Sequence, residues 1–186
     1  MKRVFDFSTA LILGIILAPI TLLVVIAVKL TSPGPALYWS DRVGKDNVLF
    51  SMPKFRTMRR DAPVVATHLL TGAQSLITPI GSFLRTLSLD EIPQLWSILR
   101  GDMSFVGPRP ALFNQDDLIA LRTQANVQSI RPGLTGWAQI NGRDELSIPA
   151  KVQYDMEYLV RQSFWFDALI LFGTLKRVIT RDGVSH

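Results

Sequence analysis

The longest apolar run of the chain lies within its first thirty residues. Positions 7–28 carry no charged residue and consist mostly of Leu, Ile, Val and Ala. As a helix rising about 1.5 Å per residue, the run would just cross a bilayer core of about 30 Å. Pro19 lies near its middle, where proline removes a backbone hydrogen bond. The pattern predicts either a kinked spanning helix or a re-entrant helix–break–helix over residues 1–30, with Pro19 at the membrane break.

Basic residues flank this run on both sides. Lys2 and Arg3 precede it, and Lys29, Arg42 and Lys45 follow it. Positive charge at both ends gives no clear inside and outside by the positive-inside rule. A helix that bends and returns would instead set both flanks against the same anionic leaflet. The charge pattern therefore favours the re-entrant form.

Beyond residue 30 the pattern changes to that of a globular domain. Two short extended segments, 36–42 and 48–55, flank a turn at 44–47. The helical periodicities that follow cover residues 80–87, 92–99, 112–127, 147–161 and 164–179. The predicted fold class is mainly α with short β segments, in a single α-rich domain over residues 31–186. The last helix is amphipathic and rich in Trp and Phe, which suits either a core or an interfacial position.

The amino-acid composition argues against several kinds of active site. The chain has no cysteine, and its only histidines are His68 and His186, so a zinc site or a serine–histidine triad is not expected. A metal would have to bind carboxylate oxygens, which favours magnesium or manganese. The net charge of +5 indicates an anionic partner. Nucleic acid is not expected as that partner, because the sequence has no known nucleic-acid-binding motif and does have an apolar segment suited to a membrane.

Two adjacent carboxylates, Asp90 and Glu91, lie in an otherwise apolar stretch. They are open to two interpretations. Ser88 and Glu91 have the spacing of a helix capping box, or Asp90 itself could cap a helix that has Pro93 in its first turn. Alternatively, the pair could be a site of chemistry.

Other segments of the chain carry basic residues that are candidates for binding an anionic substrate. Arg109 is held between two prolines, which restrict it to an extended conformation and suit a fixed phosphate contact. A purely structural pairing of Arg109 with a buried carboxylate is the alternative. Lys54 and Arg56 flank an aromatic residue in a run that could also be a solvated face. Asp155 lies at the edge of an apolar helix face, where Lys151 could neutralise it.

Five motifs follow one another along the chain: KFRTM at 54–58, LSLDEIPQL at 87–95, GDMSFVGPRP at 101–110, RPG at 131–133 and TGWAQ at 135–139. In this order they resemble the bacterial sugar transferase family of monotopic phosphoglycosyl transferases. The family commonly has serine before the membrane-break proline, whereas this chain has Ala18. We therefore expect Thr21 or backbone contacts to stabilise the bend.

The resemblance implies transfer of a phosphosugar from a UDP-sugar to undecaprenyl (polyprenol) phosphate with release of UMP. It implies a re-entrant anchor at residues 1–30 and a cytosolic, interfacial catalytic domain at 31–186 of the bacterial inner membrane. It also implies Mg2+ and a catalytic dyad on Asp90 and Glu91, both of them candidate metal ligands. Asp90 would attack the β-phosphate and carry the phosphosugar covalently.

The remaining expectations concern substrate contacts and partners. The candidate substrate-binding residues are Lys54, Arg56, Arg85, Arg109 and Asp155. The expected partners are the UDP-sugar, polyprenol phosphate and membrane lipids, and a homodimer stays open. Two alternatives are retained: a non-catalytic membrane-anchored scaffold for glycan-assembly enzymes, and one-step transfer without a covalent intermediate.

Overall fold

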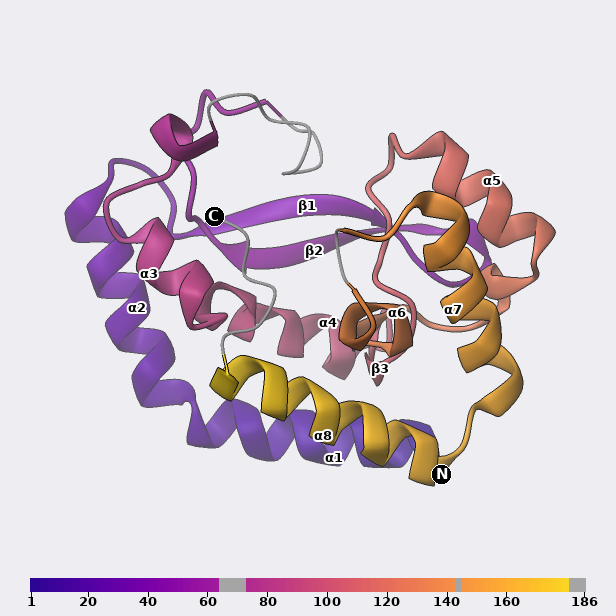
Figure 1. The fold of residues 1–186 in the computed structure, drawn as a ribbon. Coiled ribbons are helices and arrows are strands. Elements are labelled where there is room, and N and C mark those ends of the chain that lie inside the picture. The colour runs from indigo at the N-terminus through magenta and orange to yellow at the C-terminus, as the bar shows by residue number, and fades with distance from the viewer. Residues whose placement is uncertain (64–72, 143–144, 181–186) are drawn as a thin grey trace.

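A bent pair of apolar helices opens the structure, a computed structural model that describes residues 1–63, 73–142 and 145–180 (Figure 1). The pair consists of helix α1 (Lys2–Ile16) and helix α2 (Ala18–Thr31), and the chain bends by 62° between them. Within the described residues, no single helix combines the length and apolar composition needed to cross a membrane, but this bent pair does so together. His68, Arg143 and His186 lie outside the described residues.

Backbone hydrogen bonds join Leu17, the residue between the two helices, to each of them. The Leu17 amide donates to the Leu13 carbonyl at 2.8 Å, and the Thr21 amide donates to the Leu17 carbonyl at 2.8 Å. Pro19 lies in the first turn of α2, where its missing N–H removes no intrahelical bond. The predicted break at Pro19 is confirmed as a break between two helices.

A β-hairpin crosses the middle of the molecule in Figure 1. Strands β1 (Leu37–Val43) and β2 (Leu49–Phe55) pair antiparallel, with Leu37 opposite Phe55. The turn between them contains the 3₁₀ helix η1 (Lys45–Asn47), in which Asp46 and Asn47 adopt positive φ. Both residue types tolerate that conformation. The pairing of β1 with β2 confirms the predicted hairpin.

The rest of the chain is mostly helical, as predicted, but its elements are shorter near the acidic pair. In chain order they are η3 (Ala73–Leu76), α3 (Gly81–Thr86), η4 (Leu89–Gln94), α4 (Leu95–Arg100), α5 (Asp116–Gln124), η5 (Val127–Ser129), α6 (Trp137–Ile140), α7 (Ile148–Arg161) and α8 (Phe164–Thr180). Ser147 caps α7 as expected, because its Oγ accepts a hydrogen bond from the Ala150 amide.

A second, parallel pairing joins β3 (Ser104–Val106) to β4 (Gly133–Thr135). Glycines allow the two segments to approach closely. A Cβ atom at Gly133 would lie 2.1 Å from the Gly107 nitrogen, and one at Gly136 would lie 2.1 Å from the Gly107 oxygen. Both positions therefore require glycine. The pairing fixes the start of the loop that carries Arg109.

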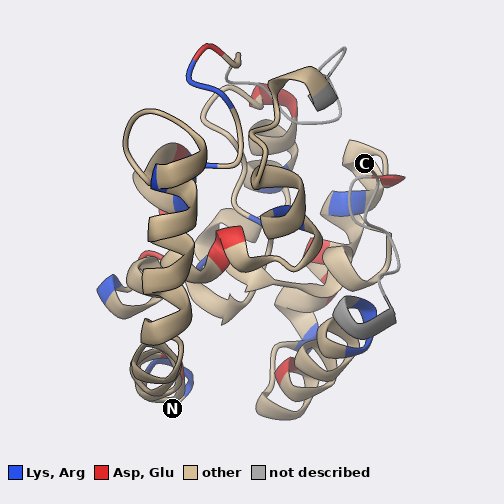
Figure 2. Ribbon diagram, turned by 90° about the vertical axis from the view of Figure 1, so that its left-hand side faces the viewer, with Lys and Arg blue, Asp and Glu red and all other residues tan. Residues whose placement is uncertain are grey.

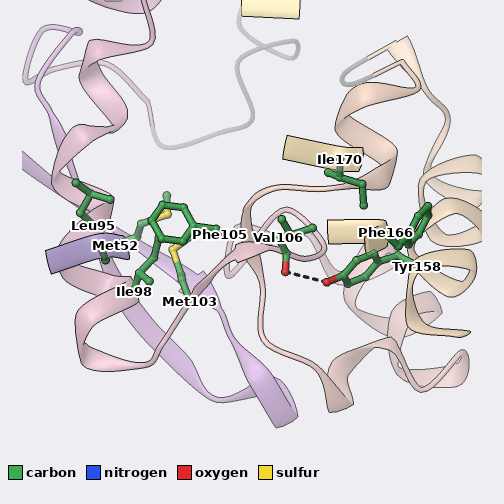
Figure 3. Close-up of a cluster of buried hydrophobic side chains, with 10 residues drawn as sticks. Met52, Leu95, Ile98, Met103, Phe105, Val106, Tyr158, Phe166 and Ile170 are labelled. Atoms are coloured by element: carbon green, nitrogen blue, oxygen red, sulfur yellow. Dashed lines mark hydrogen bonds between the residues drawn. The ribbon is translucent and has the colours of Figure 1, made fainter. Parts of the chain in front are cut away.

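Buried apolar side chains from both halves of the chain form the main core (Figure 3). Met52 comes from β2 and Ile98 from α4, whereas Tyr158 and Ile170 come from α7 and α8. Ala10 of α1 belongs to the same cluster. The first helix is thus packed onto the globular part of the chain.

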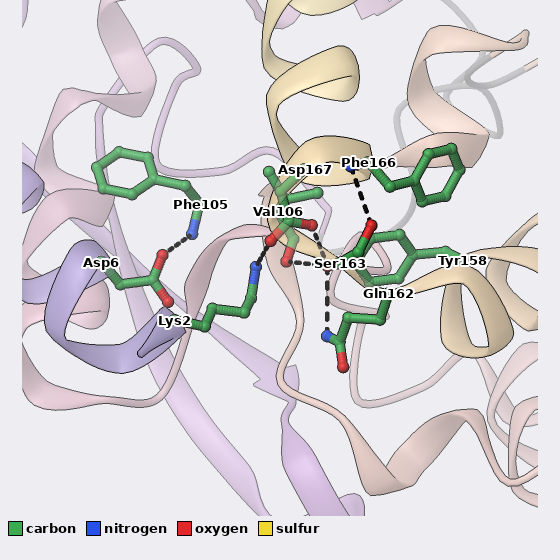
Figure 4. A network of polar contacts seen from close by, with 9 residues as sticks. All are labelled: Lys2, Asp6, Phe105, Val106, Tyr158, Gln162, Ser163, Phe166 and Asp167. Atoms are coloured by element: carbon green, nitrogen blue, oxygen red, sulfur yellow. Dashed lines mark hydrogen bonds and ion pairs between the residues drawn. The ribbon is translucent and has the colours of Figure 1, made fainter.

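Polar contacts fasten the start of α1 to the same core (Figure 4). Lys2 forms an ion pair with Asp167 of α8, and the Tyr158 hydroxyl donates to Asp167 at 2.7 Å. The Asp6 carboxylate accepts a hydrogen bond from the Phe105 amide of β3. Arg3 donates to carbonyls at the end of α4, including that of Leu99 at 2.7 Å. The N-terminal end of the apolar pair is therefore held against the globular domain.

Candidate active site

The acidic pair lies inside the 3₁₀ helix η4, between α3 and α4. Ser88 precedes it with φ of 54°, and no side chain caps the helix; the Glu91 amide instead donates to the Ser88 backbone carbonyl. The capping-box interpretation was therefore wrong, and Asp90 is not an N-cap. Pro93 restricts its own φ and shortens the helical segments around it.

Glu91 is held between two cations from distant segments. Its Oε1 lies 2.9 Å from Lys54 Nζ of β2 and 3.6 Å from Arg109 Nη2. The Arg109 side chain is 45% exposed, whereas those of Lys54 and Glu91 are 16% and 22% exposed. Arg109 therefore faces solvent on one side and the carboxylate on the other.

Asp90 is more deeply placed than its neighbour, with 8% of the residue exposed. Burial raises the pKa of its carboxyl, and Glu91 acts in the same direction, while Lys54, Arg85 and Arg109 oppose the rise. Three of the predicted cations thus act electrostatically on this one carboxylate. An ionised Asp90 would have few solvating waters and be comparatively basic.

Arg85 reaches this region from α3. Its Nε donates to the Thr57 hydroxyl at 2.9 Å, which orients the guanidinium beside the segment that follows β2. Because Arg85 also influences the pKa of Asp90, it belongs to the same charged cluster. The KFRTM motif therefore supports the site through Lys54 directly and through Thr57 indirectly.

A further cation, Arg42, was counted in the sequence only as a charge flanking the apolar run. Burial and the nearby Arg109 lower its pKa to about 10, and Tyr38 and Glu91 oppose that shift, so Arg42 stays cationic at neutral pH. Its Nε donates to Ser40 Oγ at 3.0 Å, and its Nη1 donates to the Pro110 carbonyl at 3.2 Å. The period of two in β1, which sets Ser40 and Arg42 on one face, was the available signal.

Two predicted substrate contacts have other partners in the structure. Arg56 is 5% exposed, and its guanidinium donates to the carbonyls of Ser32 and Pro33, each at 2.9 Å. Asp155 is 1% exposed, and its Oδ2 accepts from Arg122 Nε at 2.9 Å and Nη2 at 2.7 Å. Arg56 thus closes the turn after α2. Asp155 pairs with Arg122, and Lys151, which could have neutralised it, acts on it only electrostatically.

The described residues contain no group of three or more His, Asp or Glu side chains arranged to hold a metal. Magnesium nevertheless often binds proteins through one or two carboxylates and completes its shell with water and substrate phosphates. Asp90 and Glu91 supply that minimal donor set. The residues therefore fit a magnesium ion that binds together with a phosphorylated substrate.

Basic and acidic positions are scattered through the globular part, whereas Lys29 is the one charged residue of α2 (Figure 2). At the acidic pair, three cations, Lys54, Arg85 and Arg109, act electrostatically on the buried Asp90 carboxylate, and a fourth, Arg42, interacts with Glu91. Fixed cations in a partly dehydrated site stabilise negative charge that develops during reaction. The arrangement suits attack by a carboxylate on a phosphorus centre whose oxygens the cations neutralise.

Residues 1–181 match the family model described as bacterial sugar transferase. The chain is 37% identical over 188 residues to the uncharacterized sugar transferase EpsL of Bacillus subtilis, covering 100% of this chain and 91% of that protein. It is 40% identical over 191 residues to the UDP-glucose:undecaprenyl-phosphate glucose-1-phosphate transferase of Caulobacter vibrioides, covering 97% and 70%.

A longer relative is the undecaprenyl-phosphate glucose phosphotransferase of Komagataeibacter xylinus. The two sequences are 39% identical over 195 residues, which cover 96% of this chain but only 36% of that protein. The chain therefore spans about a third of this relative and most of the length of EpsL.

Proposed function

This chain belongs to the bacterial sugar transferase family, and we propose on that basis that it transfers a sugar phosphate from a UDP-sugar to polyprenol phosphate. The observation that carries the proposal is the buried Asp90 carboxylate, adjacent to Glu91 and surrounded by cations. The names of the Caulobacter and Komagataeibacter relatives support undecaprenyl phosphate as the acceptor.

The reaction would proceed in two displacements. In the first, an Asp90 carboxylate oxygen attacks the β-phosphorus of the UDP-sugar; the bond from that phosphorus to the bridging oxygen breaks, and UMP leaves. In the second, a phosphate oxygen of the polyprenol phosphate attacks the same phosphorus. The Asp90–phosphorus bond then breaks, which restores the carboxylate and leaves a polyprenol diphosphate sugar.

The cationic residues around Asp90 would neutralise the negative charge of the substrate phosphates. Arg42, Arg109 and Arg85 neutralise the phosphate oxygens, and Lys54 holds Glu91 beside Asp90. Glu91 and Asp90 would hold Mg2+, which when bound neutralises charge on the phosphate oxygens of the substrate. The partial burial of Asp90 weakens its hydration, so its electron pair is more available to the phosphorus.

The bent helix pair supports a re-entrant anchor. Both of its ends contact the same globular part: Lys2 pairs with Asp167, and Val28 of α2 packs in one cluster with Phe55 and Leu84. A spanning helix would carry those ends to opposite sides of the membrane. We therefore propose that the pair enters and leaves the cytosolic leaflet of the bacterial inner membrane, with the domain of residues 31–186 on the cytosolic face.

Helix α8 has the features of an interfacial helix. Trp165, Leu169 and Phe172 share a face at helical spacing and are 80%, 51% and 71% exposed. Aromatic side chains are favoured at the headgroup level of a bilayer. This face would bring the active site to the depth at which a polyprenol phosphate presents its headgroup.

The decisive experiment follows UMP release by the full-length protein in lipid nanodiscs with a UDP-sugar and undecaprenyl phosphate. We expect wild-type protein and the exposed-residue control Asp116→Asn to release UMP, and Asp90→Asn to release none. Mass spectrometry should detect the phosphosugar adduct on Asp90 when acceptor is omitted. UMP release by Asp90→Asn would contradict the proposal, and absence of activity in the wild type across a panel of UDP-sugars would favour the scaffold alternative. Turnover that needs Asp90 but gives no adduct would favour one-step transfer.

A further inference from the structure

The loop that carries Arg109 is held almost entirely through its carbonyl oxygens. Pro108 and Pro110 have no amide hydrogen, so the loop has few donors of its own. The four consecutive carbonyls of residues 108–111 each accept a hydrogen bond. Their donors are the Gly133 amide at 2.9 Å, Arg122 Nη1 at 2.7 Å, Arg42 Nη1 at 3.2 Å and the Val43 amide at 2.9 Å.

Arg122 of α5 makes the second of these four contacts, to the carbonyl of Arg109 itself. Two of its other nitrogens, Nε and Nη2, bind one carboxylate oxygen of Asp155, which lies on α7 and is 1% exposed. The Arg122 side chain is only 12% exposed. Because the guanidinium is planar, fixing two nitrogens on Asp155 also fixes the direction of the third.

The side chain of Arg109 contacts the acidic pair. Its Nη2 lies 3.6 Å from Glu91, and nearly half of the side chain is exposed to solvent. The backbone carbonyl of Arg109 is thus held by Arg122, and its guanidinium lies near Glu91. Displacement of this backbone would move the cation relative to Asp90 and Glu91.

We propose that Arg122, oriented by Asp155, is a positioning residue that acts on the reaction through the backbone of Arg109. The proposal rests on the proposed function for its effect on rate and on the observed contacts for its effect on the loop. Asp155 would then act on the substrate only through Arg122 and Arg109, and would not bind the substrate directly. A displaced catalytic group can cost roughly 10- to 100-fold in rate, so the effect should be measurable.

The test combines a structural and a kinetic readout on the full-length protein in nanodiscs. Hydrogen exchange of the segment 104–113 should be faster in Arg122→Lys than in the wild type, while exchange in α8 stays unchanged. A lysine can keep the charge next to Asp155, but it cannot bind that carboxylate and the Arg109 carbonyl in the same planar geometry. Arg161→Lys on α7 is the matched control, because the side chains of Arg161 and its partner Glu157 are 51% and 40% exposed, and it should match the wild type in both readouts.

The kinetic readout is a double-mutant cycle on UMP release. Arg122→Lys should lower kcat roughly 10- to 100-fold. In the Arg109→Ala background the same substitution should cause almost no further fall, because the cation it positions is gone. Equal effects in both backgrounds, or unchanged loop exchange in Arg122→Lys, would overturn the inference. If the wild type releases no UMP, the proposed function fails while loop exchange still decides whether Arg122 holds the loop.

Discussion

Lys54 and Glu91, 37 positions apart in the sequence, form an ion pair of 2.9 Å that joins β2 to the 3₁₀ helix η4. Both side chains are mostly shielded from solvent, so the pair is weakly screened by salt. It fixes the carboxylate beside Asp90 at the same time as it brings a cation to the site. The charge state of Lys54 should therefore control the activity of the enzyme.

The alkaline limit of activity should be set by Lys54. Burial lowers the pKa of its ammonium group, and Glu91 acts against that shift. Because the cationic form is needed, activity should decline as pH rises through the lowered pKa. Lys54→Arg should move this decline to higher pH, since arginine keeps its charge, while lowering kcat roughly tenfold through its different geometry.

The measurement is the pH dependence of kcat/KM for UMP release by the two proteins over the neutral and alkaline range. Arg59→Lys is a suitable control, because Arg59 pairs with Asp61 and both side chains are about 60% exposed. An alkaline limb that stays at the same pH in Lys54→Arg would assign the titration to a different group.

Asp90→Asn should abolish transfer yet make the protein more stable at neutral pH. Burial raises the pKa of Asp90 in the folded state, so the folded protein binds its proton more tightly than the unfolded chain does. Asp90 therefore favours folding at acidic pH, and this contribution is lost as pH rises through its raised pKa. A neutral isostere removes that cost, with an expected gain of roughly 1 kcal/mol, the usual scale of a single substitution.

Thermal or denaturant unfolding of both proteins at neutral pH and at mildly acidic pH checks this expectation. The gain should shrink in acid, where wild-type Asp90 is itself protonated. Asp116→Asn on the exposed side of α5 should be close to neutral at both pH values. Lower stability of Asp90→Asn at neutral pH would mean that the ionised carboxylate contributes favourable contacts that exceed its burial cost.

Local sequence patterns were sufficient to predict several parts of the fold. Pro19 predicted the helix break, and the Gly and Asn residues of 44–47 predicted the hairpin turn, because these residues act through their own backbone angles. Ser147 predicted the start of α7 through its hydroxyl. At Ser88 the same reasoning failed, since the spacing of a capping box does not require that the segment be an α-helix.

The parts that depend on distant contacts were not predictable in this way. The pairing of β3 with β4 joins segments about thirty residues apart, and nothing in either segment alone specifies the other. Arg56 and Arg109 were both predicted to contact substrate, yet Arg56 binds backbone carbonyls in the interior while Arg109 faces an acidic pair. Which arginine is buried is decided by tertiary packing, and so was the pairing of Asp155 with Arg122.

Arg56→Lys should reduce stability with little effect on the chemistry of the folded protein. The guanidinium binds the carbonyls of Ser32 and Pro33 and the Ser32 hydroxyl, all in a largely buried setting. An ammonium group cannot satisfy these acceptors in the same plane, and buried groups left unpaired cost roughly 1–3 kcal/mol each. Denaturant unfolding should show this loss, whereas kcat at low temperature should stay within about threefold of the wild type. A large fall in kcat without loss of stability would return Arg56 to the substrate contacts.

The re-entrant arrangement predicts that both ends of the helix pair are protected from an external reagent in intact cells. The chain has no cysteine, so a cysteine inserted after Met1 or substituted as Lys45→Cys would be the only thiol. A membrane-impermeant maleimide should label neither protein in intact cells and both after permeabilisation. The contacts of Lys2, Arg3 and Asp6 with the globular domain supply the physical reason, because they keep the start of α1 on the same side as the hairpin turn. A periplasmic protein with one exposed thiol serves as the positive control in the same cells. Labelling of the N-terminal cysteine alone in intact cells would establish a spanning helix, and it would also mean that these three polar contacts do not form in the membrane.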